Sequence, residues 1–170
     1  MQPDSSLRSH LEHLNLSIDF SFFLPENLAE VTQVLIYVPG DGGNSTQLDQ
    51  VTHPIAAQNE LLYVGVDSAG TLKHRRNNLY QLIKSLLLQD PNLSISIVAT
   101  SSGAAPVSLL ALTDISQSIK SVLYLDPANY PIAEISGGDP TYWCGNDEYS
   151  AHNALQNVSY ANRYWVEKTF

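Results

Sequence analysis

The stretch "SISIVATSSGAAPVSLLAL", residues Ser94–Leu112, decides the fold of this chain. Its first half alternates polar and apolar residues, which predicts a β-strand, and its second half has the apolar spacing of a helix. Small residues fill the junction between the two halves. A strand that turns directly into a helix strains the backbone of its turn residue, here Ser101, and needs small neighbours two positions away. Those neighbours are Ala99 and Gly103.

Other segments repeat the strand pattern. Three continuous apolar runs end in turn residues, which is typical of strands buried on both faces of a parallel sheet. They are "VLIYVPGDGG" (34–43), "LLYVGVDSAG" (61–70) and "SVLYLDPAN" (121–129). A further segment, 14–22, has apolar residues at every second position and predicts a half-buried strand that Pro25 ends.

Helices are predicted between these strands, at 45–59, 79–87, 103–112 and, at the end of the chain, 158–170. Alternating strands and helices favour right-handed crossovers and a mostly parallel sheet. We therefore expect one α/β domain over residues 1–170, a three-layer sandwich of a central sheet flanked by helices, without a cap domain. Its chemistry should collect at the carboxyl ends of the strands.

Composition narrows the function classes. The chain has 170 residues, 44% hydrophobic and 15% charged, and its apolar runs are too short to span a bilayer. A net charge of -9 opposes binding to nucleic acid or anionic membranes. The one basic cluster, "KHRR" at Lys73–Arg76, is predicted to be a solvated loop, with docking of an anionic ligand group as the alternative. Cys144 is the single cysteine, and no segment resembles a signal peptide, so we expect a cytoplasmic protein.

Ser101 is the candidate nucleophile. Residues 99–103 have the pattern small-x-Ser-x-small at a strand-to-helix turn, which is the pattern of a nucleophile elbow. The start of the following helix favours developing negative charge. The backbone N–H of Ser102 would then face an oxyanion formed at Ser101.

A second oxyanion donor is predicted in the glycine-rich loop "PGDGG" after the strand 34–38. Glycines let backbone N–H groups approach a ligand closely. The N–H of Asp41 or of Gly42 is the candidate. We expect the Asp41 carboxylate to point away from the anion.

A serine nucleophile needs a base and an acid that orients the base. His152 is the predicted base, because it lies just before the final predicted helix and a loop there can reach back across the sheet to Ser101. The acid is either Asp139 or Asp126, each followed by a proline, with Asp139 favoured and Asp147 a weaker third candidate. The other histidines are predicted to be surface residues: His10, His13, His53 and His74.

The order serine, aspartate, histidine on a parallel sheet resembles the α/β-hydrolase superfamily. The resemblance rests on "VLIYVPGDGG", "VATSSGAA", "LYLDPANY" and "SAHNAL". "LYLDPA" is similar to the strand-end aspartate motif of neutral lipases, which would make Asp126 the acid. "GGDPTYWCGNDEYSAH" is similar to the cutinase segment of aspartate, cysteine and catalytic histidine, although Cys144 has no partner for the cutinase disulfide. The resemblance implies a small serine esterase or lipase.

The sequence therefore predicts a hydrolase that forms an acyl-enzyme on Ser101 and cleaves small-molecule carboxylic esters or thioesters. No metal or organic cofactor is needed, and a monomer or weak homo-oligomer is expected. Tyr130, Tyr142 and Trp143 are predicted to line the substrate site. Two alternatives remain: a non-catalytic binding or scaffold protein on the same fold, and an acyltransferase with the same triad.

Overall fold

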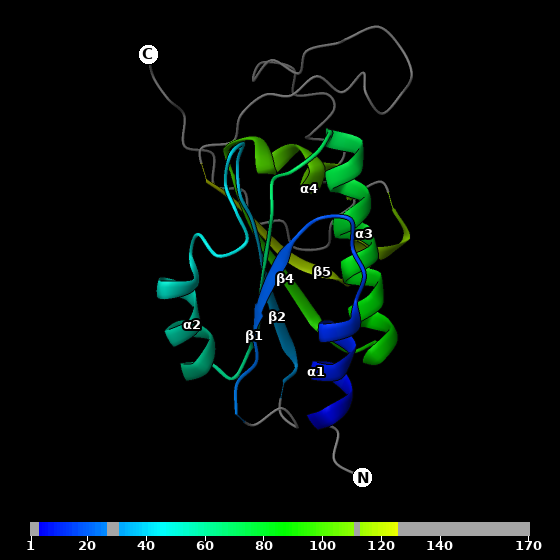
Figure 1. Ribbon diagram of the computed structural model, residues 1–170. Coiled ribbons are helices and arrows are strands. Elements are labelled where there is room, and N and C mark those ends of the chain that lie inside the picture. The colour runs from blue at the N-terminus through cyan, green and yellow to red at the C-terminus, as the bar shows by residue number, and fades with distance from the viewer. Residues whose placement is uncertain (1–3, 27–30, 111–112, 126–170) are drawn as a thin grey trace, which may run out of the picture.

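The structure is a computed structural model that describes residues 4–26, 31–110 and 113–125. The described chain forms one five-stranded sheet with helices packed against it (Figure 1). In chain order the elements are α1 (Asp4–His13), β1 (Phe20–Phe23), β2 (Gln33–Val38), α2 (Asp49–Gln58), β3 (Leu62–Val66), α3 (Leu72–Gln89), β4 (Ser94–Thr100), the 3-10 helix η2 (Ser101–Gly103), α4 (Ala104–Leu110), the 3-10 helix η3 (Asp114–Ser118) and β5 (Ile119–Leu125).

The sheet has the strand order β1-β3-β2-β4-β5. Strand β1 runs antiparallel to β3, and the pairs β2–β3, β2–β4 and β4–β5 are parallel. This arrangement confirms the predicted α/β fold class with a mostly parallel sheet. The strands predicted from the continuous apolar runs correspond to β2, β3 and β5, and the opening stretch forms β4, η2 and α4.

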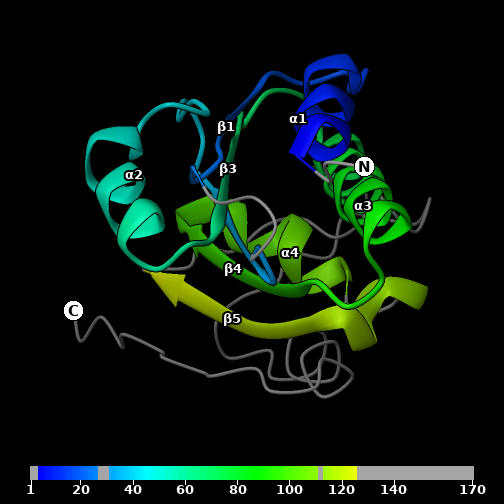
Figure 2. The same cartoon turned by 90° about the horizontal axis from the view of Figure 1, so that it is seen from below.

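The two faces of the sheet carry separate apolar clusters, because successive side chains of a strand point to opposite faces. On one face Val34, Ile36 and Val38 of β2 pack with buried residues of α1, α3 and α4. On the other face Tyr37 packs with Ala56 of α2. Figure 2 shows α2 on one side of the sheet and α1, α3 and α4 on the other, which gives the three predicted layers.

The first strand differs from the prediction. The alternating segment 14–22 was expected to be extended throughout, but β1 covers only Phe20–Phe23. The Ser17 N–H donates to Asn78 Oδ1 of α3 at 3.0 Å, so this backbone group bonds to a helix side chain rather than to a strand. Leu14 and Leu16 still pack against the core, which explains their apolar character without a strand.

The strand order creates a switch point between β2 and β4. The chain leaves β2 for α2 on one face of the sheet, and it leaves β4 for α4 on the opposite face. Neighbouring parallel strands whose connections diverge in this way open a crevice at their carboxyl ends, where ligands bind in open α/β sheets. Val38 of β2 pairs with Ala99 of β4, so Gly40 and Ser101 follow at the same level.

The predicted helix at 158–170 lies outside the described residues. Within the part of the chain that the structure describes, none of the helices combines the length and the apolar character needed to cross a bilayer.

Candidate functional site

Four of the predicted site residues lie together at the switch point: Ser101, Ser102, Asp41 and Gly42. Asp41 and Gly42 belong to the loop after β2, and the two serines form the turn after β4. The remaining candidates lie outside the described residues; they are Asp126, Tyr130, Asp139, Tyr142, Trp143, Asp147 and His152.

Ser101 occupies a strained backbone conformation. Its φ is 48°, and the only other non-glycine residue with positive φ among the described residues is Glu60. A non-glycine residue in the left-handed backbone region has a conformational energy about 1–2 kcal/mol above that of the right-handed region. Strand β4 ends one residue earlier at Thr100, and the 3-10 helix begins at Ser101 itself. The direct strand-to-helix turn predicted from the sequence is therefore present.

Gly103 allows this turn to lie against the end of β2. A Cβ at position 103 would come within 2.4 Å of the Val38 carbonyl oxygen and 2.6 Å of the Pro39 carbonyl oxygen. These are backbone atoms that cannot move aside easily. The absence of a side chain at position 103 thus sets how closely the Ser101 turn and the β2 loop can approach each other.

The loop after β2 also touches Ser101 directly. A Cβ at Gly40 would lie 2.7 Å from the Ser101 Cβ and 3.2 Å from its Oγ. The Gly40 N–H donates to Thr100 Oγ1 at 3.2 Å, and the same oxygen lies 3.3 Å from the Tyr37 hydroxyl. Thr100 therefore ties the start of the glycine-rich loop to the residue before the turn.

A pocket of about 330 Å³ opens at this junction. Ser101 and Thr100 form one wall, and the glycine-rich loop forms the other. Its lining residues are Gly40, Asp41, Gly42, Gly43, Gln47, Thr100 and Ser101. Three of these seven residues are glycines, which expose their backbone, so the pocket can present N–H groups to a bound carbonyl or anion beside the Ser101 hydroxyl.

Arg75 is the residue that sequence analysis missed. The segment Lys73–Arg76 was predicted to be a solvated loop, but it forms the first turns of α3, and Arg75 is only 2% exposed. Its Nη2 donates to the Pro39 carbonyl at 2.8 Å, and its Nη1 donates to Asp41 Oδ1 at 3.1 Å. The helix begins before this basic segment because Thr71 caps it: the Thr71 side-chain oxygen accepts from the His74 N–H at 3.3 Å.

The Asp41 carboxylate has a second partner in the Ser101 turn. Ser102 is buried, and its Oγ donates to Asp41 Oδ1 at 2.8 Å. The Asp41 side chain is itself 65% exposed. Arg75, Asp41 and Ser102 therefore connect α3, the glycine-rich loop and the Ser101 turn through one carboxylate oxygen.

The described histidines do not lie in this pocket. His53 of α2 stacks on Phe23 with ring centroids 4.9 Å apart, and its Nε2 lies 3.5 Å from Asp49 Oδ1. His10 of α1 contacts the Ser85 hydroxyl of α3. Among the residues that the structure describes, no cluster of histidine, cysteine and acidic side chains could hold a metal ion.

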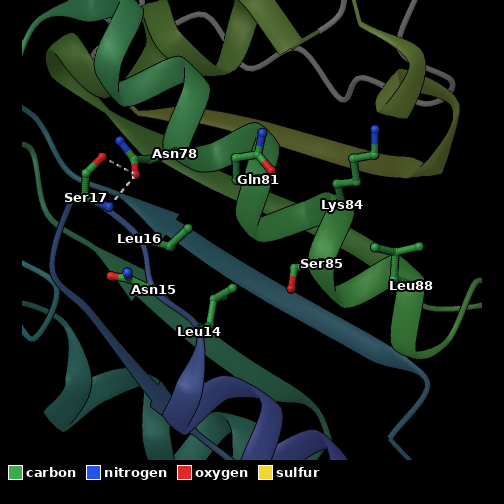
Figure 3. A pocket seen from close by; sticks show the side chains of 9 residues that line it. All are labelled: Leu14, Asn15, Leu16, Ser17, Asn78, Gln81, Lys84, Ser85 and Leu88. Atoms are coloured by element: carbon green, nitrogen blue, oxygen red, sulfur yellow. Dashed lines mark hydrogen bonds between the residues drawn. The ribbon is translucent and has the colours of Figure 1, made fainter.

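A second pocket, of about 520 Å³, lies between α3 and the segment that joins α1 to β1 (Figure 3). Its residues hold the two segments together: the hydroxyl and N–H of Ser17 both donate to Asn78 Oδ1. The Lys84 ammonium donates to the Tyr80 hydroxyl at 2.9 Å. We interpret this pocket as a packing groove, because Ser17 and Asn78 bond to each other and Ser85 contacts His10 of α1.

The chain is similar in structure to two solved esterases and a solved hydrolase. Est1E from Butyrivibrio proteoclasticus matches with a TM-score of 0.53 and 17% identity, over 82% of this chain and 65% of its own. Thermogutta terrifontis esterase 2, phosphonylated by cyclosarin, matches with a TM-score of 0.54 and 12% identity, over 74% of this chain and 59% of its own. S-formylglutathione hydrolase from Staphylococcus aureus matches with a TM-score of 0.52 and 11% identity, over 83% of this chain and 63% of its own.

These likenesses confirm that the chain has the α/β-hydrolase fold. The chain spans less than two thirds of the length of each of these neighbours. No protein-family model matches the sequence. A comparison with curated proteins found no match either. One fold supports many activities, so the activity of this chain is argued from its own residues.

Proposed function

We propose that this chain, on its α/β-hydrolase fold, is a serine hydrolase that cleaves carboxylic esters or thioesters through an acyl-enzyme on Ser101. The observation that carries the proposal is the φ of 48° at Ser101, in the turn between β4 and η2. Strain at a non-glycine residue persists only when surrounding contacts enforce it, and it concentrates at functional sites. A nucleophile elbow requires this strained turn.

The surroundings of Ser101 support the same proposal. The half-buried Ser101 borders the pocket, and the backbone of Gly40 approaches its side chain from the neighbouring loop. A carbonyl bound there would meet the Ser101 hydroxyl on one side and loop backbone on the other. We assign the oxyanion donors to the Ser102 N–H and to the N–H of Asp41 or Gly42.

The reaction follows from these roles. Ser101 Oγ attacks the carbonyl carbon while His152 accepts the hydroxyl proton. The tetrahedral oxyanion accepts hydrogen bonds from the two backbone donors. Its collapse breaks the bond to the alcohol or thiol, which leaves with the proton from His152, and water then hydrolyses the acyl-enzyme by the same steps. Asp139 or Asp126 orients the imidazole, and Tyr130, Tyr142 and Trp143 line the substrate site.

Covalent labelling with a fluorophosphonate probe tests this function. The wild-type chain should be labelled, and mass spectrometry of the modified peptide should place the label on Ser101. Ser101→Ala should abolish both labelling and hydrolysis of a short-chain chromogenic ester while the protein remains folded. Ser102→Ala should still be labelled, because Ser102 contributes its backbone N–H to the reaction.

Other results would contradict the proposal. A folded wild-type chain without labelling or ester hydrolysis would favour a non-catalytic binding protein. Labelling of Ser101→Ala together with loss of labelling in Ser102→Ala would move the nucleophile by one residue. Formation of a new ester when an alcohol acceptor is added would favour acyl transfer over hydrolysis.

A further inference from the structure

We propose that Arg75 is a positioning residue that holds the loop Pro39–Gly43 at the distance from Ser101 at which the loop N–H groups can stabilise an oxyanion. The proposal rests on the function proposed above and names a residue outside the expected triad and oxyanion hole. It is carried by three hydrogen bonds that meet on one loop.

The guanidinium of Arg75 contacts this loop at two points. One N–H donates to the Pro39 carbonyl at 2.8 Å, and another donates to Asp41 Oδ1 at 3.1 Å. These acceptors lie on either side of Gly40, the residue whose backbone touches Ser101. A planar guanidinium that binds two acceptors restricts both the position and the orientation of the segment between them.

The third bond fixes the loop to the Ser101 turn. Ser102 Oγ donates to the same Asp41 oxygen at 2.8 Å. Asp41 and Ser102 are also the residues whose backbone N–H groups are the candidate oxyanion donors. One carboxylate therefore links the two sides of the proposed oxyanion hole, and Arg75 holds that carboxylate from α3.

Charge supports this role. A carboxylate beside a developing oxyanion would oppose its formation through like-charge repulsion. The Arg75 guanidinium carries the opposite charge and lies 3.1 Å from Asp41 Oδ1. The pair can thus supply a rigid, polar contact without adding net negative charge next to the anion.

The burial of Arg75 is difficult to explain by stability alone. The side chain is 2% exposed, and its Nε finds no hydrogen-bond partner among the described residues. A buried N–H without a partner costs stability. An apolar side chain of similar length would avoid that cost, but it could not bind Pro39 and Asp41. The binding of the loop is therefore the function that this geometry assigns to Arg75.

Steady-state kinetics on a short-chain chromogenic acetate ester test the inference in the full chain. Arg75→Met should lower kcat by about 10–100-fold with KM within about threefold, since a small misplacement of a catalytic group costs up to about 10² in rate. Arg75→Lys should fall between Arg75→Met and the wild type, because an ammonium keeps the charge without the two-pronged contact. Arg76→Met is the matched control on the same turn: Arg76 bonds to its neighbour Asn77, and its loss should leave kcat unchanged.

Variants of Asp41 keep the test decisive if Arg75→Met does not fold, because the Asp41 side chain is 65% exposed. Asp41→Ala should lower kcat as Arg75→Met does. Asp41→Asn should lower kcat much less, since its amide oxygen can still accept from Arg75 and Ser102. The double variant Arg75→Met with Asp41→Ala should lose less turnover than the product of the two single losses, because the two side chains share the contact between Arg75 and Asp41.

These measurements distinguish failure of the proposed function from failure of the role proposed for Arg75. A wild-type chain that neither hydrolyses the ester nor reacts with the fluorophosphonate probe would overturn the proposed function and this inference with it. An active wild type with unchanged kcat in a folded Arg75→Met or Asp41→Ala variant would overturn the inference alone. A loss of thermal stability with unchanged kcat would likewise assign Arg75 a purely structural role.

Discussion

The backbone of Gly40 lies so close to Ser101 that a Cβ at position 40 would come within 2.7 Å of the Ser101 Cβ. The two residues are far apart in the sequence and meet because β2 and β4 are neighbouring parallel strands. This contact sets the width of the site between the glycine-rich loop and the Ser101 turn.

Gly40→Ala should therefore reduce turnover. The new methyl group must push the loop away from Ser101, and a displacement of this kind costs on the order of 10²-fold in rate. The measurement is kcat on a short-chain chromogenic ester, with folding checked by circular dichroism. Gly70→Ala is the control, because its Cβ would lie 2.5 Å from the His74 ring at a φ of +89°, away from Ser101. That variant should lose stability and keep its turnover; equal turnover losses in both variants would contradict the prediction.

The strained turn predicts an unusual order of stability at position 101. Glycine adopts a φ of 48° without steric cost, whereas alanine does not. Ser101→Gly should thus be more stable than Ser101→Ala by about 1 kcal/mol, measured by denaturant unfolding. At Gln81, an exposed position inside α3, the order should reverse, with alanine more stable than glycine by about 1 kcal/mol. If alanine is also the more stable residue at position 101, the strain is absent.

Stability should fall in alkaline solution. Burial raises the pKa of Tyr63 from 10.0 to about 12, and burial also raises the pKa of Tyr124. The native state therefore holds these phenolic protons at a pH where the unfolded chain releases them. The contribution of the protonated, buried phenols to the free energy of unfolding is fully present below pH 10. For Tyr63 it is lost as the pH rises from about 10 to 12.

The free energy of unfolding against pH, measured by urea titration, checks this expectation. Tyr63→Phe should show a shallower decline than the wild type above pH 10, because phenylalanine has no proton to release. Tyr124→Phe should also show a shallower decline above pH 10, although it removes the contact between the Tyr124 hydroxyl and Ser108 Oγ as well. Declines of equal slope in the wild type and both variants would show that other groups control alkaline unfolding.

The triad acid is predicted to be Asp139. A short chain segment that carries both Asp139 and His152 can pair them with less loss of entropy than two distant loops. Asp139→Asn should lower turnover by about 10⁴-fold, the loss seen when the acid of a serine-protease triad is replaced by asparagine. Asp126→Asn should cost little turnover. A folded Asp139→Asn variant with near-native turnover, beside an inactive Asp126→Asn variant, would assign the role to Asp126.

The sequence by itself predicted most of the elements and the strand-to-helix turn at which the candidate site lies. Apolar runs of strand length predicted β2, β3 and β5, and the stripe of Leu79, Leu82, Ile83 and Leu86 predicted α3, because these patterns reflect how each segment buries its side chains. The junction of strand and helix predicted the turn at Ser101. These features are local, so a single segment carries the information for each of them.

Only the tertiary structure decided which segments meet. The strand order brings Gly40 beside Ser101, and Ser17 bonds to Asn78 of α3 instead of extending β1. The clearest case is Arg75, because a basic cluster near a turn has the composition of a solvated loop. Its acceptors, the Pro39 carbonyl and the Asp41 carboxylate, come from a loop more than thirty residues earlier in the chain. A charged side chain is buried only where such partners surround it, and the folded arrangement of β2, β4 and α3 supplies them.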